Sequence, residues 1–448
     1  MPSTLIHNAT LVNERRVYRG SLLIEGTFIK ALYEGDNAID KAFTQAVSSQ
    51  TQLLDASHLF LLPGIIDDQV HFRDPGQPQK GTLRQESKAA LLGGVTSFMD
   101  MPNNVPPTTN QETLHHKYQV AAQEAYANYA FYIGTTNDNA LEAVNVSPPC
   151  CGIKVFMGSS TGNMLVDNPQ ALEQLFSQAP GVVATHCEDE DIIKANKERI
   201  LSSPHLHPSA SLHPLIRSRE ACIASTQKAL ALAKRFHTKL HVLHITTADE
   251  VELLREAQQT YPSITGEVCV HHLWFTQDDY PAYGNLIKCN PAIKLANDRE
   301  ALRQGIRDGV LQVIGSDHAP HTWEEKAQPY PTAPAGIPLV QHSLLMMLEL
   351  VDKGVFTLEQ VVNGMCHGPA RVFSLPKRGF LRPGCFADLT LVAHTPYTVT
   401  PANTGYTCHW SPFTGHTFPY HVAHVFVNGC QAVSDGTLVS RPPVMAIR

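Results

Sequence analysis

The sequence lacks a long hydrophobic run, a dense set of cysteines and an excess of charge of one sign. No stretch of about 18 apolar residues occurs in its 448 residues, so a membrane-spanning helix is not expected. The start of the chain lacks the charged-then-apolar order of a signal peptide. Ten scattered cysteines do not make a disulfide scaffold in so long a chain, and they suit a reduced, cytoplasmic protein.

The charges are mixed along the chain. There are 41 acidic and 34 basic residues, which gives a net charge of −7. Without a basic stripe or an acidic tail, neither a nucleic-acid partner nor a disordered tail is expected. The 43% hydrophobic content is enough for a large core. The 23 histidines are the informative excess, because several of them stand where apolar runs end.

From residue 63 onward, short apolar runs alternate with longer helical stretches. The predicted strands are residues 65–72, 95–102, 128–134, 152–158, 181–187, 240–246, 264–272 and 310–318, and the predicted helices are residues 82–94, 113–127, 169–179, 219–237, 247–261 and 299–309. Eight such strands favour a (β/α)8 TIM barrel, an α/β fold, over a doubly wound sheet, which is the alternative.

Both ends of the chain have a different pattern of apolar and polar residues. Residues 1–62 and 380–448 read as short strands with turns, which predicts one discontinuous, β-sandwich-like small domain built from both termini. Residues 63–379 would be the barrel. The Pro-rich stretch at 322–338 reads as a lid or as a loop that lines the site.

Polar side chains occupy many strand ends of the predicted barrel. Barrel enzymes place their chemistry at the carboxyl ends of the strands. The residues at those ends are His71, Asn103, Lys154, His186, His244 and Asp317. Each has an ordinary explanation alone: Asp317 could cap a helix, and Lys154 could pack its stem and reach water. Together, imidazoles and a carboxylate at one barrel mouth indicate a zinc-type site.

The lysine is the unusual member. Lys154 stands between apolar residues, and a buried amine has a lowered pKa. A neutral amine can add carbon dioxide to form a carbamate that could bridge two metals. The alternative is a lysine paired with Asp317 or with a substrate anion.

Eight segments carry a family resemblance that spans nearly the whole chain. They are PGIIDDQVHFRDPG, MPNN, GIKVF, ATHCED, LHVLHIT, VHHLWF, CNPAIK and GSDHAPH. With them the chain resembles the dihydroorotases of the amidohydrolase superfamily, and it is similar to allantoinases and hydantoinases. The combination of Arg73, Asn103 and the DHAPH motif favours the dihydroorotases. The resemblance implies the reversible, metal-dependent cyclisation of N-carbamoyl-L-aspartate to L-dihydroorotate in de novo pyrimidine (UMP) biosynthesis.

The resemblance also implies roles for single residues. Asp317 would be the catalytic proton shuttle and a metal ligand, together with His71, His186, His244 and a carbamylated Lys154. The substrate-binding residues would be Arg73, Asn103, Asn290 and His318. Arg73 suits the carboxylate of the substrate, although a surface charge is the alternative. His271 and His272 are expected to pack behind the site rather than to bind metal.

Gln69 departs from the family pattern, which has a histidine there. An amide oxygen is a poor zinc ligand. We therefore expect one firmly bound Zn²⁺ and a second that is weak or absent, with Gln69 a weak ligand or none. A catalytically dead partner of aspartate carbamoyltransferase is the alternative, but such chains tend to lose several ligands together. A small-molecule substrate and a homodimer are expected by analogy with the family.

Overall fold

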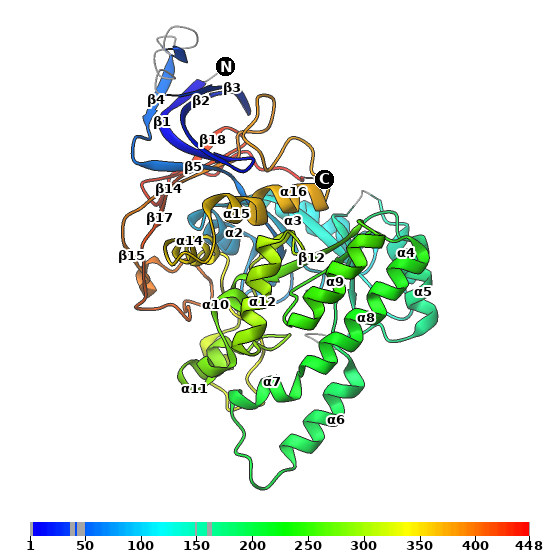
Figure 1. Cartoon of the computed structure of the whole chain (residues 1–448). Coiled ribbons are helices and arrows are strands. Elements are labelled where there is room, and N and C mark those ends of the chain that lie inside the picture. Colours follow the sequence, from blue (N-terminus) through cyan, green and yellow to red (C-terminus); the bar gives the residue numbers. More distant parts are fainter. Residues whose placement is uncertain (1–2, 36–40, 43–49, 148–149, 159–163, 448) are drawn as a thin grey trace.

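The computed structural model describes residues 3–35, 41–42, 50–147, 150–158 and 164–447 (Figure 1). Eight parallel strands form one sheet in chain order from β6 to β13. They are β6 (Ile65–Val70), β7 (Val95–Asp100), β8 (Asn128–Gly134), β9 (Gly152–Phe156), β10 (Val183–His186), β11 (Leu240–Val242), β12 (Ile264–Cys269) and β13 (Val313–Gly315). A parallel bridge between Val70 and His318 joins the two edges, so the sheet closes into the predicted barrel.

Helices cover the outside of the barrel (Figure 1). The longer ones are α2 (Leu83–Leu92), α3 (Gln111–Glu124), α5 (Pro169–Gln178), α6 (Glu190–Leu201), α8 (Arg219–Phe236), α9 (Ala248–Thr260), α12 (Ala296–Arg307) and α14 (Ser343–Asp352). The short ones include α4 (Ala140–Val144), α7 (His213–Ile216), α10 (Val270–Trp274), α11 (Tyr280–Tyr283), α13 (Trp323–Lys326), α15 (Leu358–Val362) and α16 (Gly368–Val372). Local sequence sets several starts: the Thr247 hydroxyl accepts from the backbone N–H of Glu250, which completes a capping box at α9.

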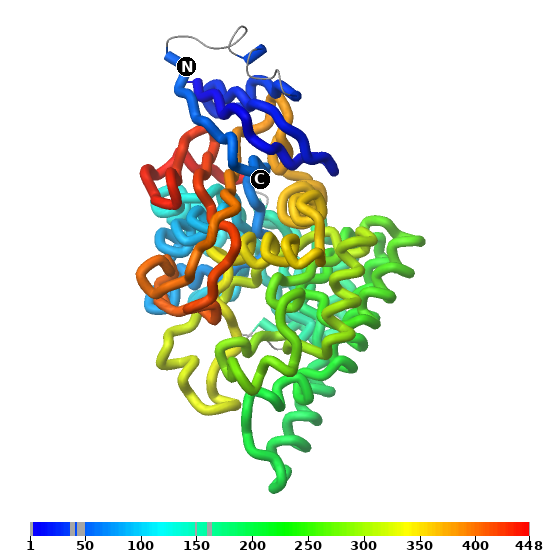
Figure 2. The backbone as a smooth tube through the Cα atoms, turned by 60° about the vertical axis from the view of Figure 1, so that its left-hand side comes forward, coloured from blue at the N-terminus to red at the C-terminus, as the bar shows by residue number. Residues whose placement is uncertain are grey.

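Strands from both ends of the chain pair in a second, nine-stranded sheet (Figure 2). Its members are β1 (Ser3–Asn13), β2 (Arg16–Glu25), β3 (Phe28–Glu34), β4 (Thr51–Asp55), β5 (Leu59–Pro63), β14 (Leu389–Ala393), β17 (His421–Val427), β18 (Cys430–Ser434) and β19 (Thr437–Leu438). The antiparallel pair of β5 and β14 joins the two ends of the chain. Leu11, Leu61, Leu389 and Phe426 share one buried cluster, so the predicted β unit from both termini is confirmed. β15 (Tyr397–Thr398) and β16 (Thr417–Phe418) form a separate ribbon.

A layer of buried acids lies inside the barrel below the carboxyl ends of the strands. Asp68, His241 and Glu267 are fully buried, and His241 Nε2 lies 3.2 Å from Asp68 Oδ2. Burial and the charge of Asp68 raise the pKa of Glu267 well above its ordinary value. Gly315 makes room for this layer, because a Cβ there would lie 3.0 Å from the Glu267 carboxyl carbon. No helix in the described part of the chain could span a membrane.

Candidate active site

One cavity lies at the carboxyl ends of the barrel strands. Its lining residues are Gln69, His71, Lys154, Phe156, His186, His244, Asn290, Asp317, Ala319, Ala335 and Gly336. The lining residues come from strands β6, β9 and β10, from the first residues after β6, β11 and β13, and from the loops that contain Asn290 and Ala335. All the residues predicted to hold metal are therefore brought together, although they span about 250 positions of the sequence. The Pro-rich loop contributes Ala335 and Gly336, so it lines the site as predicted.

Lys154 points into the cavity from β9 and is 1% exposed. Its Nζ has no hydrogen-bond partner among the described residues, and it lies 4.6 Å from the centre of the Phe156 ring. Burial lowers the pKa of the amine to about 8, although the charges of Asp317 and Glu267 oppose this shift. A substantial share of the side chain is thus neutral near pH 8, which is the form that reacts with carbon dioxide.

His186 and His244 face each other beside the lysine. His186 Nδ1 lies 2.9 Å from His244 Nε2, and both residues are buried. Burial lowers the pKa of both imidazoles, and for His244 the neighbouring charges of His186 and Lys154 add to the effect. Both rings are therefore neutral, which is the form that binds metal.

A carboxylate orients the first of these rings. His186 Nε2 lies 2.9 Å from Glu188 Oε2, so Nε2 carries the hydrogen and Nδ1 keeps the lone pair that faces His244 Nε2. Arg217 pairs with the same carboxylate. Although burial raises the pKa of Glu188, the charge of Arg217 and the bond to His186 hold it at about 2. The sequence predictions gave Glu188 no role; the available signal was its spacing of two residues from His186.

The opposite side of the cavity is internally bonded. His71 Nδ1 lies 2.7 Å from Asn103 Oδ1, and Nε2 donates to Asp317 Oδ1 at 3.1 Å. Gln69 donates its amide N–H to the same Asp317 oxygen, also at 3.1 Å. Burial raises the pKa of Asp317, but the hydrogen bond and charge of His71 outweigh burial and hold the pKa below the ordinary value. Gln69 therefore acts here as a donor to Asp317.

The backbone of three of these residues is left-handed. Arg73, His244 and Asp317 have φ values of 65°, 38° and 46°. Residues other than glycine rarely adopt this conformation, and it costs on the order of 1 kcal/mol each. The turn that follows each strand thus places the side chain at the expense of backbone strain.

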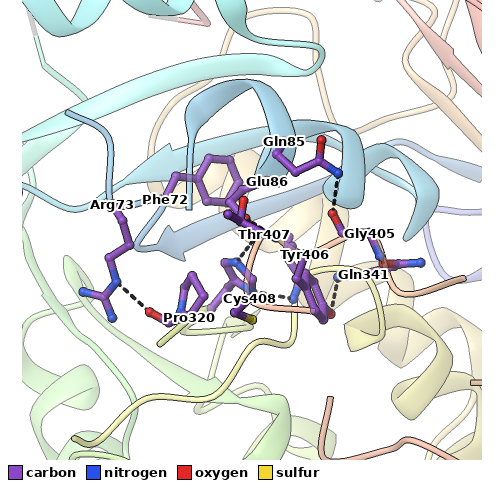
Figure 3. Close-up of polar contacts among 12 residues, drawn as sticks. Phe72, Arg73, Gln85, Glu86, Pro320, Gln341, Gly405, Tyr406, Thr407 and Cys408 are labelled. Carbon is purple, nitrogen blue, oxygen red and sulfur yellow. Dashed lines mark hydrogen bonds and ion pairs between the residues drawn. The ribbon is translucent and has the colours of Figure 1, made fainter. Parts of the chain in front are cut away.

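The residues predicted to bind substrate are placed unevenly. Asn290 lines the cavity, and its Oδ1 accepts from His213 Nε2 at 2.9 Å. Asn103 reaches the site through His71. Arg73 is buried next to the site and is not among the lining residues; its Nε donates to the Pro320 carbonyl at 3.1 Å (Figure 3). Burial lowers the pKa of Arg73 to about 10, so it remains a cation at neutral pH.

His318 is not at the cavity, contrary to the sequence prediction. Its Nε2 lies 3.0 Å from Glu86 Oε2 on α2, and its Nδ1 accepts from the backbone N–H of Leu339 at 3.0 Å. The same glutamate accepts from the backbone N–H of Thr407 (Figure 3). With both ring nitrogens bonded and no exposure, His318 holds α2 and the following loops together. The sequence could not show this because Glu86 lies 232 residues away.

The donors fit a divalent metal ion. An unpaired buried amine, two neutral imidazoles 2.9 Å apart and a third imidazole beside a carboxylate provide the nitrogen and oxygen ligands that zinc-type sites use. The unpartnered Lys154 Nζ is the strongest single sign, because a buried polar group without a partner is costly unless it serves a function.

Comparisons with known proteins agree with this geometry. A model of the amidohydrolase family matches residues 167–432. The dihydroorotase of Pyrococcus furiosus is 30% identical to this chain, over 94% of each chain. The dihydroorotase of Halobacterium salinarum is also 30% identical, over 95% of this chain and 98% of the relative. The L-hydantoinase (dihydropyrimidinase) of Arthrobacter aurescens superposes with a TM-score of 0.93 at 26% identity, over 100% of both chains. Members of this superfamily depend on metal, and a chain with this match and these relatives belongs to the amidohydrolase family.

Proposed function

We propose that this protein is a dihydroorotase, which opens the cyclic amide of L-dihydroorotate and closes N-carbamoyl-L-aspartate in the reverse direction, a step of de novo pyrimidine biosynthesis. The observation that carries the proposal is the convergence of Lys154, His186, His244, His71 and Asp317 on one cavity. The names of the relatives support the choice of substrate.

The metal is proposed to be Zn²⁺. A carbamylated Lys154, His186 and His244 would hold one ion firmly, and His71 and Asp317 would contribute to a weaker second position, where Gln69 offers little. The ion would polarise the ring carbonyl and lower the pKa of a bound water.

Asp317 is proposed to move the proton. Its pKa lies below the ordinary value, so it is ionised and ready to accept a proton in the first step. The carboxyl can then pass that proton to the ring nitrogen as the C–N bond breaks. In the reverse direction Asp317 takes the proton from the ureido nitrogen as water leaves. The hydrogen bond from Gln69 fixes the orientation of the carboxylate for both transfers.

Arg73, Asn103 and Asn290 are proposed to recognise the substrate. Arg73 is the cation suited to a carboxylate, and its guanidinium is held in place by the bond from Nε to Pro320 and by a contact of 3.2 Å between Nη2 and His321 Nε2. Asn290 and the loop at Ala335 and Gly336 line the cavity. His318 is left out of this role, because its ring is bonded elsewhere.

The test is ring opening of L-dihydroorotate by purified protein supplied with zinc. We expect turnover well above that of a Lys154→Ala control, and equal rates would overturn the proposal. The native mass of the protein, compared with that of the control, should include one added carbon dioxide if Lys154 is carbamylated.

A hydantoinase is the second candidate, because the structural similarity to the Arthrobacter enzyme covers the whole chain. A panel of cyclic amides separates the two. Arg73→Ala should impair only the use of a ring that carries a carboxylate. Size-exclusion chromatography tests the expected homodimer, and co-purification with aspartate carbamoyltransferase tests the association with that enzyme.

A further inference from the structure

A second cluster of metal-type side chains lies where β12 runs into α10. Cys269, His271 and His272 are all buried, and one potential ligand atom of each lies within 4.8 Å of the other two. None of the three lines the cavity described above. A thiol with two imidazoles is a donor set that favours zinc and related borderline cations over magnesium or calcium.

The two rings are short of hydrogen bonds. His272 donates from Nε2 to the Pro291 carbonyl at 3.1 Å, which fixes the tautomer and leaves a lone pair on Nδ1. That Nδ1 has no partner among the described residues, and neither ring nitrogen of His271 meets hydrogen-bond geometry there. The backbone of Ser316 raises the pKa of His271 slightly, but burial outweighs this effect and lowers the pKa to about 4. Such deficits in a buried cluster call for an explanation.

The cluster adjoins the side of the cavity that Gln69 lines. Cys269 Sγ lies 4.0 Å from Gln69 Oε1 and 3.2 Å from Glu267 Oε1. Asp317 is near enough to both Cys269 and His271 for its negative charge to favour the protonated form of each. The donors of β12 and α10 therefore stand next to the position where the amide of Gln69 replaces an imidazole.

A neighbouring cluster of buried polar side chains shows that burial alone does not leave ring nitrogens without hydrogen bonds. Asp68, His241 and Glu267 also come close enough together to hold a metal. There, however, the imidazole is bonded at both nitrogens, to Thr265 Oγ1 at 2.8 Å and to Asp68 Oδ2 at 3.2 Å. Its ring has no lone pair to spare, whereas the rings after β12 do.

We propose that Cys269, His271 and His272 bind a divalent cation of the zinc class and so supply the soft ligands that Gln69 does not. The S–H bond of Cys269 breaks on binding, a metal–sulfur bond forms and the proton is released to solvent. The proposal deepens the proposed function, since the cation would be the second metal of the same centre, displaced toward β12.

The test uses cobalt as a spectroscopic stand-in for zinc. The full chain is stripped of metal with a chelator and reloaded with Co²⁺, and metal content and the near-ultraviolet thiolate-to-cobalt band are measured. We expect the band in the unmodified protein and in Lys154→Ala. We expect Cys269→Ser to lose the band and about one equivalent of metal. Cys222→Ser, which alters a buried cysteine of α8, should behave like the unmodified protein.

Two outcomes overturn the proposal: a loaded protein without the band, or a Cys269→Ser variant that keeps it. Should Cys269→Ser fail to fold by circular dichroism, X-ray absorption on the unmodified zinc-loaded protein decides, because a sulfur neighbour should appear at about 2.3 Å from zinc. The band and the enzymatic assay are separate readouts. Ring opening without a band refutes only this site, and a band without ring opening refutes only the dihydroorotase activity.

Discussion

The two halves of the cavity differ in how many of their buried polar atoms have hydrogen-bond partners. On the half formed by β9 to β11, Lys154 Nζ and His244 Nδ1 have no hydrogen-bond partner among the described residues. On the half formed by β6 and the residues after β13, one oxygen of Asp317 faces both the His71 ring and the Gln69 amide at 3.1 Å. The first half needs a further group to complete it, whereas the second is already bonded.

This difference follows from the chemistry of the glutamine at position 69. An imidazole at position 69 could offer a lone pair to a metal, but the amide of Gln69 instead offers a hydrogen to Asp317. The carboxylate stays oriented without a cation beside it. A glutamine at position 69 is therefore compatible with a carboxylate held in place for proton transfer.

The largest effect is expected from removing the lysine of the unsatisfied half. Lys154→Met should lower the rate of ring opening by more than about 10⁴-fold, beyond the effect of losing a general acid alone. The melting temperature of the metal-free protein should not fall, because an unpaired buried ammonium is replaced by an apolar side chain. A Lys154→Met enzyme that keeps the unmodified rate would show that this half does not hold the catalytic metal.

Removing the proton shuttle from the satisfied half comes next. Asp317→Asn keeps the shape but cannot carry a proton, so kcat should fall by about 10²–10⁴-fold. The pH profile is the informative readout, since the limb that reports ionisation of this carboxyl should disappear. If the acidic limb persists in Asp317→Asn, another group moves the proton.

A smaller effect is expected from restoring the imidazole. Gln69→His should tighten binding of the weaker metal by about 10–100-fold, the range that metal-site changes commonly produce. Competition with a chromophoric chelator measures this affinity. Gln69→Leu is the matched control, because it loses the bond to Asp317 and adds no ligand. Equal affinities in the two variants would mean that position 69 does not limit metal binding.

The smallest effect concerns the Pro-rich loop that lines the cavity. Lys326 donates to the carbonyls of Pro334 and Gly336, and burial lowers the pKa of its amine from 10.5 to about 7. Between these values the unfolded chain binds more protons than the folded one, so the free energy of unfolding should rise with pH. Denaturant titrations from pH 7 to 10 should show a shallower rise for Lys326→Met. An unchanged slope would mean that Lys326 keeps its ordinary pKa when folded.

The barrel could be predicted because its strands are buried on both faces and read as apolar runs, and because parallel strands bring their carboxyl ends together. The convergence of Lys154 and Asp317 follows from that topology. Helix α6 was not predicted, since only Ile193 and Ile200 of its residues are buried and hydrophobic, which leaves a faint apolar stripe. The domain boundaries predicted at residues 62 and 380 stay predictions.

Side-chain partners that are distant in sequence were out of reach. Nothing in the DHAPH motif indicates that His318 pairs with Glu86 on α2. Likewise, the spacing of two between His71 and Arg73 suggests that both face inward along a strand, but β6 ends at Val70 and the φ of Arg73 is 65°. The alternation of side chains no longer applies once the backbone leaves the strand.

The left-handed backbone of Arg73, His244 and Asp317 has a consequence for directed evolution of this protein. Glycine relieves the strain at such positions, so a library screened only for heat resistance should enrich glycine there and return stable but inactive proteins. Selection for thermostability alone would then favour substitutions at active-site positions that abolish activity.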